Sequence, residues 1–106
     1  MHLSTVSNDV SIGLYTTNAN ASARNWLIST NEIAYGDFNI KQSNAIGGNP
    51  RSAGTSRFYI QNDGNVGIGR TDPAYKLDVS TSIVSRSNIS TPRFSSAGGY
   101  VYGITN

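Results

Sequence analysis

The sequence predicts an all-β protein with the length of one domain, and three observations support this prediction. Short stretches of alternating apolar and polar residues recur, separated about every ten positions by turn-forming residues. Helical periodicity is nearly absent. The chain has 15 Ser, 9 Thr, 12 Asn and 11 Gly, nearly half of its 106 residues, and these residues favour turns and strands over helix interiors. We therefore expect short antiparallel strands in a subunit like a β-sandwich or β-prism.

The first four predicted strands alternate in the way that half-buried strands do. They are residues 9–16, 24–30, 36–43 and 56–61. The apolar residues that share a face in them are Val10, Ile12 and Leu14, then Trp26 with Ile28, Phe38 with Ile40, and Phe58 with Ile60. The stretch from residue 42 to residue 56 contains Gly-Gly and Asn-Pro, so we expect a long exposed loop between the third and fourth strands.

The later strands are shorter and follow a tight turn. Asp63 and Gly64 predict a hairpin turn, because Asp-Gly accepts the positive φ that such turns need. Residues 65–69 and 75–79 then alternate again and predict two more strands.

A helical turn is expected between these two strands. Asp72 is the expected N-cap of that turn, and Pro73 suits its first position. Residues 1–80 thus form a β-rich module. Residues 81–106 read as an extended Ser/Thr-rich segment with a terminal strand at 99–105.

Composition argues against several function classes. The net charge is only +2 and the basic residues are scattered, so we expect no nucleic-acid partner. No apolar run approaches the ~20 residues of a membrane span, so we expect no membrane insertion. The chain has no cysteine and one histidine, His2, and we expect no metal site, cofactor or catalytic site.

The glycines of GNVGIG invite comparison with a phosphate-binding loop. Gly64, Gly67 and Gly69 follow the pattern G-x-x-G-x-G rather than G-x-G-x-x-G, and no Lys-Ser/Thr pair follows them. A structural role is favoured, because glycine weakens a strand unless another group must come close to its face. A neighbouring sheet or chain packed on Gly67 and Gly69 would meet that condition.

The segment GNVGIGRTDPAYKLDV (64–79) resembles the GNVGIGTT-x-P-x-x-x-LDV segment of phage tail fibres and related viral and bacterial fibre proteins. In those proteins it often precedes an endosialidase-type intramolecular chaperone domain. The likeness extends upstream through residues 24–26 and 35–44, covering approximately residues 20–80. Arg70 stands where the family usually has Thr, and Asp72 where it commonly has Ser.

The resemblance implies an intertwined homotrimer that serves as a structural module of a virion or extracellular fibre, joined to neighbouring fibre segments, and not an enzyme. A shared interior would suit a chain with only 23 Leu, Ile, Val and Phe residues among 106. The candidate residues of that trimer core are Val66, Ile68, Leu77 and Val79.

Two alternatives stay open at this point. The first is a receptor-binding tip that recognises a cell-surface glycan or protein, with Tyr59, Asn49 and Arg51 as candidate contacts. Tyr59 alternates with Phe58 and Ile60 and is expected to face outward. The second is a carbohydrate-processing enzyme, which needs a pair of carboxylates. Turns and strand starts account better for the aspartates, so this alternative ranks last.

Overall fold

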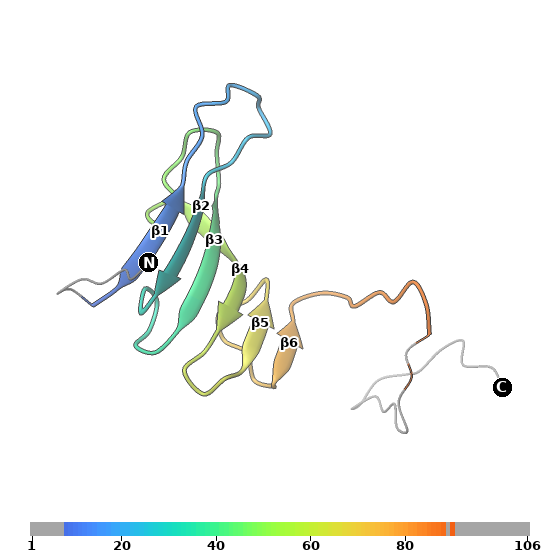
Figure 1. Cartoon of the computed structure of the whole chain (residues 1–106). Coiled ribbons are helices and arrows are strands. Elements are labelled where there is room, and N and C mark those ends of the chain that lie inside the picture. The colour runs from blue at the N-terminus through green and yellow to red at the C-terminus, as the bar shows by residue number, and fades with distance from the viewer. Residues whose placement is uncertain (1–7, 89, 91–106) are drawn as a thin grey trace.

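The chain folds as six β-strands in one mixed sheet, seen in a computed structural model that describes residues 8–88 and 90 (Figure 1). The order across the sheet follows the order in the chain. The strands are β1 (Val10–Leu14), β2 (Trp26–Thr30), β3 (Phe38–Ser43), β4 (Gly54–Ile60), β5 (Val66–Ile68) and β6 (Leu77–Val79). The described residues contain no helix, and so none that could cross a membrane.

The all-β prediction is confirmed, and the strand positions match closely. Five strands lie inside their predicted ranges, while β4 begins at Gly54 rather than at residue 56. The long loop between β3 and β4 covers residues 44–53. Residues 81–88 form no strand, and the strand predicted at 99–105 lies outside the described residues.

The expectation of purely antiparallel pairing is wrong at the last pair. Strands β1 to β5 pair antiparallel, but β6 runs parallel to β5, with Val66 beside Leu77 and Ile68 beside Val79. A tight hairpin would have reversed the chain, whereas residues 69–76 carry it back to the start of β5. Gly69 turns the chain with a φ of +74°. The Asp78 carboxylate then accepts a hydrogen bond from the Ala74 N–H at 2.9 Å.

Residues 69–76, which connect the parallel strands β5 and β6, are called the crossover loop here. The turns beside and within this loop differ in how well they were predicted. The Asp63-Gly64 turn is present, since Asp63 Oδ1 accepts from the Asn65 N–H at 2.9 Å and Gly64 has a φ of +89°. The helical turn predicted after Asp72 and Pro73 is wrong. Residues 74–76 only bend, and the Asp72 carboxylate accepts hydrogen bonds from the side chain of Arg70 instead of capping a helix.

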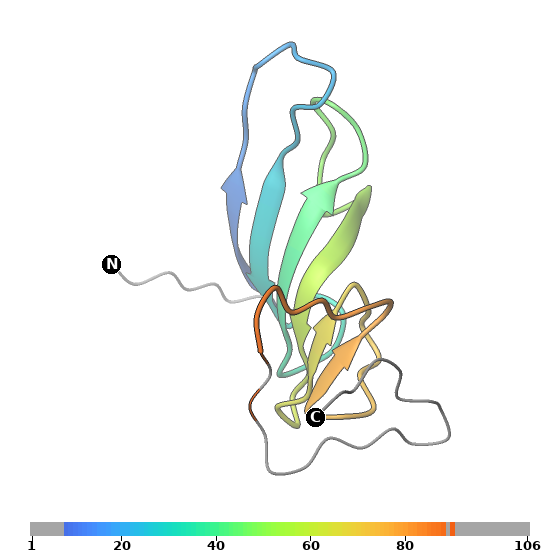
Figure 2. The same cartoon turned by 90° about the vertical axis from the view of Figure 1, so that its right-hand side faces the viewer.

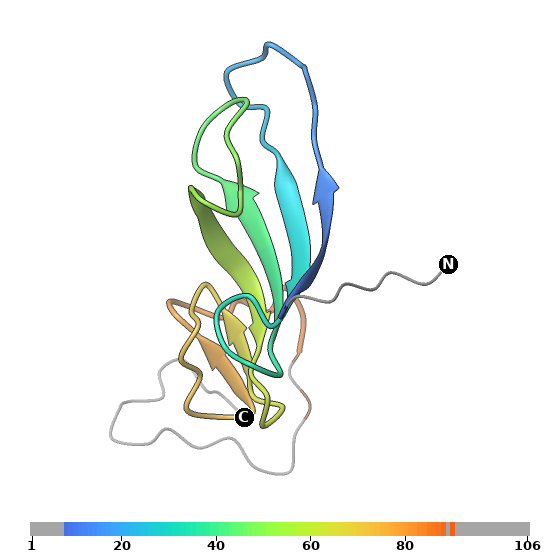
Figure 3. The same cartoon turned by 90° about the vertical axis from the view of Figure 1, so that its left-hand side faces the viewer.

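The long connections gather at the two ends of the sheet. Figure 2 and Figure 3 show loops 15–25 and 44–53 at one end, and loop 31–37 at the other end beside the turns of β5 and β6. Loop 15–25 is held by short-range bonds, because the side-chain oxygens of Thr16, Asn18 and Asn20 each accept from the backbone N–H two residues later.

The glycine at position 67 is needed because the chain itself comes close to it. A Cβ at Gly67 would lie 2.3 Å from the backbone oxygen of Arg70. The prediction of a close approach at Gly67 is therefore confirmed, but the group that approaches belongs to the crossover loop rather than to a neighbouring chain.

We expect Gly67→Ala to lower the free energy of unfolding by about 1–3 kcal/mol, because a rigid backbone atom must move to admit the methyl group. Gly13→Ala is the matched control, since the atoms nearest its added Cβ belong to the exposed ring of Tyr15, a side chain that can move aside. Urea unfolding of both variants at one chain concentration measures the difference. Equal stability of the two variants would contradict this account.

Candidate assembly surface

The two faces of the sheet differ in chemistry, and the apolar one is not covered by any described part of the chain. Residues paired across the strands form two rows that run from edge to edge. The first row is Val10, Thr30, Phe38, Ile60, Val66 and Leu77, and the second is Ile12, Ile28, Ile40, Phe58, Ile68 and Val79. All of these twelve residues except Thr30 are apolar, and only the second row is apolar on every strand. We call the twelve, with Leu14 and Trp26 beyond them, the apolar face.

No residue of the apolar face is buried within the single chain. The side chains nearest its outer edges are the most open, with Leu77 58% and Leu14 54% exposed. Between β1 and β3 the face is hollowed to about 160 Å³, with Val10, Ile28 and Phe38 among the lining residues. Exposed apolar area of this extent is typical of an interaction surface rather than of a free monomer.

The four candidate core residues lie together on this face. Val66 neighbours Leu77 and Ile68 neighbours Val79 across the parallel pair, so all four form one patch at one side of the sheet. The sequence did not show that this patch continues without a break into β4, β3, β2 and β1. That continuation depends on strand register, which alternation within single strands does not determine.

The opposite face is polar and is covered by the chain's own loops. Leu27 and Tyr59 are its buried apolar members, at 4% and 2% exposure. The buried polar and charged residues on it and beside it are Asn25, Ser29, Asp37, Asn39, Lys41 and Ser43. The described part of a single chain therefore has a small, largely polar interior, while most of the large apolar side chains of its strands lie on the other face.

A buried ion pair lies at the centre of the polar face. Lys41 Nζ lies 2.8 Å from Glu32 Oε1 and also donates to the backbone oxygen of Arg51 at 2.9 Å. Glu32 Oε2 accepts from the Ser29 hydroxyl at 2.9 Å and from the Asn39 amide at 3.0 Å. These contacts join loops 31–37 and 44–53 to the strands, and they use both oxygens of the carboxylate.

Asp37 holds loop 31–37 in a closed shape. Its carboxylate accepts from the backbone N–H groups of Glu32, Ile33 and Ala34 at 2.9–3.1 Å. Burial of the Tyr59 ring and the nearby negative charge of Asp37 raise the pKa of the Tyr59 hydroxyl above its usual value. Tyr59 is only 2% exposed, so the interpretation of it as an outward-facing residue is wrong: its side chain does lie opposite Phe58 and Ile60, but it is buried on that face.

The other two candidate receptor contacts hold a loop in place. Asn49 is exposed, and its side-chain oxygen accepts from the Tyr15 hydroxyl at 3.3 Å and from the Arg51 N–H at 2.9 Å. The Arg51 guanidinium bonds the carboxylate of Asp9 and the hydroxyl of Ser11, next to and within β1. Their role in binding a receptor stays a prediction.

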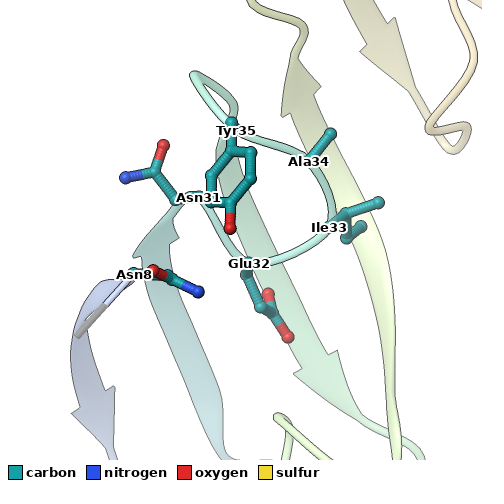
Figure 4. A pocket seen from close by; sticks show the side chains of 6 residues that line it. All are labelled: Asn8, Asn31, Glu32, Ile33, Ala34 and Tyr35. Atoms are coloured by element: carbon teal, nitrogen blue, oxygen red, sulfur yellow. The ribbon is translucent and has the colours of Figure 1, made fainter.

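A polar hollow of about 290 Å³ lies at the opposite end of the sheet, beside loop 31–37 (Figure 4). Its lining includes Asn8, Asn31 and Tyr35, and the Tyr35 side chain is highly exposed at 72%. The Glu32 carboxylate at its base is already paired with Lys41. The hollow thus presents two amides, one aromatic ring and the apolar side chains of Ile33 and Ala34, with no second acidic side chain in its lining.

Two charged residues of the 64–79 segment have roles that the sequence reasoning missed. Arg70 bridges Asp72 and Asp78, with N–O distances of 2.9 and 3.1 Å. These carboxylates raise the pKa of the Arg70 guanidinium, Asp72 by its hydrogen bonds most of all. The alternation Leu77-Asp78-Val79 was a usable signal, since it places Asp78 on the face opposite the apolar pair, where the crossover loop lies.

Among residues 8–88 and 90, no group of three or more His, Cys, Asp or Glu side chains is placed to hold a metal ion. A scan against protein-family models finds no match to this chain, and a search of curated proteins likewise finds none.

Proposed function

We propose that this chain is a structural module of a homotrimeric fibre of the phage or virus type, and that the apolar face is the contact between its copies. One observation carries the proposal: a sheet whose apolar rows extend across all six strands has no covering layer in the described chain. Stable domains bury such a face against a second layer. The likeness of residues 64–79 to fibre proteins supports further copies as that layer.

The energy available from this face is large for so small a chain. Fully burying one Val, Leu, Ile or Phe side chain contributes about 1.5–3 kcal/mol. The apolar face carries more than ten such side chains, already partly buried. Covering it would contribute on the order of 10 kcal/mol per chain, before the cost of association is subtracted. A module of this kind would hold three chains in register within a virion or extracellular fibre, joined to neighbouring fibre segments.

The solution mass tests this proposal. We expect light scattering of the purified chain at micromolar concentration to give three times the mass of the 11.3 kDa chain. A stable, folded monomer over the same concentration range would overturn the proposal, because the apolar face would then be tolerated in water.

The two alternatives have less support. Under the receptor-tip interpretation Tyr59 would contact a receptor, but its side chain is buried. Asn49 and Arg51 already bond to groups of their own chain. The hydrolase interpretation needs two carboxylates able to exchange protons at one site. Glu32, Asp37 and Asp78 are all engaged in holding loops.

A further inference from the structure

The apolar rows run to both outer edges of the sheet instead of ending in a polar rim. Val10 and Ile12 of β1 begin the same two rows that Leu77 and Val79 of β6 end. Interaction patches on free surfaces are usually bordered by polar residues. A partner that covers only the middle of this face would leave the side chains at both edges exposed.

The two edges carry no proline, bulge or inward-pointing charge, which are three of the features that normally prevent strand pairing. Strand β6 is three residues long, so the pairing would involve its two outward peptide groups and the ends that flank them. Strands β1 (VSIGL) and β6 (LDV) contain no proline, and their one charge, Asp78, is bonded to Arg70 on the opposite face. The one register shift lies in the middle of the sheet, between Ile40 and Lys41 of β3. Within the described residues, each outer strand pairs on one side only.

We propose that the outer edge of β6 in one copy pairs, in parallel, with the outer edge of β1 in the next copy, so that three sheets close into a three-sided ring with the apolar face inside. This proposal rests on the proposed function. The two edges differ, so the contact is head-to-tail, and head-to-tail contacts generate closed rings when the rotation allows it.

Strand directions agree with this arrangement. Four antiparallel pairings make β5 run in the direction of β1, and the parallel fifth pairing gives β6 that same direction. Copies related by rotation about an axis along the strands share one orientation, so β6 meets the next β1 in parallel. Val10 and Ile12 then lie level with Leu77 and Val79 of the adjacent copy, and both rows continue around the ring.

Side-chain size favours three copies. A sheet of six strands spaced about 4.8 Å apart is roughly 29 Å wide, which places the middle of each side about 8 Å from a threefold axis. In a two-sheet sandwich that distance is only about 5 Å. The aromatic residues Trp26, Phe38 and Phe58 all lie on the middle strands β2, β3 and β4, where a three-sided ring has most space to fill.

Cross-linking on the outer face tests the edge contact. The chain has no native cysteine, and Ser11 of β1 and Ser80 just after β6 are both exposed. In the proposed register Ser11 lies diagonally across from Ser80 of the next copy, about 8 Å away for a strand spacing of about 4.8 Å and a rise of about 6.6 Å over two residues. We expect a short thiol cross-linker to convert the double variant Ser11→Cys/Ser80→Cys into a covalent trimer on a denaturing gel.

Three controls make either outcome informative. Ser11→Cys and Ser80→Cys alone should not cross-link, since copies of one edge lie about a sheet width apart in the ring. The pair Asn44→Cys/Thr55→Cys should react within one chain, because these side chains already touch at 2.7 Å. A trimeric mass with no covalent trimer, or cross-linking by Ser80→Cys alone, would overturn the edge contact and leave the proposed function standing. A monomeric mass would overturn both.

Discussion

Ile68→Asp is expected to convert the assembly into monomers and to unfold them. Ile68 is 36% exposed in the single chain and lies between Phe58 and Val79 in the second apolar row. In an assembly sealed by this face, the substitution buries an unpaired carboxylate, which costs several kcal/mol in each copy. Sedimentation should show loss of the trimer, and circular dichroism should show loss of strand signal at the same chain concentration.

Ile46→Asp is the matched control for this prediction. Ile46 is 44% exposed, similar to Ile68, but it lies in loop 44–53 instead of on the apolar face. We expect Ile46→Asp to keep the trimer and to change stability by no more than about 0.5 kcal/mol. If the Ile68→Asp chain kept the mass and the stability of the control, the apolar face would not be an assembly surface.

The sequence predicted the strands well because alternation is a local property. Val10, Ile12 and Leu14 show the period of two on their own, as do Phe58 and Ile60. Asp63-Gly64 predicted its turn correctly for the same reason: a positive φ at Gly64 is a requirement of one residue. Features of this kind can be recognised without knowing what any other part of the chain does.

The features that were missed depend on residues far apart in the sequence. Tyr59 has the alternation of an outward residue, yet it is 2% exposed and lies close to Asp37, which closes loop 31–37. Asp72 and Pro73 favour a helix start locally, but the crossover loop already has its acceptor in Asp78. Alternation distinguishes the two faces of a strand, yet it does not say which face the chain's own loops will cover.

The loops cover the polar face of the sheet and leave the apolar face open, and the energetic consequence can be measured. The interior of a single chain is centred on the Lys41–Glu32 pair, and its polar groups hold the loops on the outer side of the sheet. An isolated copy therefore has little apolar burial of its own, with only Leu27 and Tyr59 as buried hydrophobic residues among those described. The polar interior joins the loops to the sheet, and the apolar face remains available for the contact between copies that we propose.

Lys41→Met is accordingly expected to destabilise the fold by about 3–5 kcal/mol, since it removes one partner of a buried pair and leaves the charge of the other uncompensated. Both side chains are nearly inaccessible, at 11% for Lys41 and 8% for Glu32. Urea unfolding at fixed chain concentration measures the loss. The matched control is Lys76→Met, because Lys76 is exposed and its ammonium makes one 3.3 Å contact with the Asp63 carbonyl.

The double variant Glu32→Gln/Lys41→Met separates the charge from the packing. The amide that replaces the Glu32 carboxylate can still accept from the Ser29 hydroxyl or the Asn39 amide, which are the donors that Glu32 now uses. Without a buried charge the cost of Lys41→Met should fall, so we expect the double variant to be more stable than Lys41→Met alone. If it is instead less stable than either single variant, the two losses add, and the pair does not act through charge compensation.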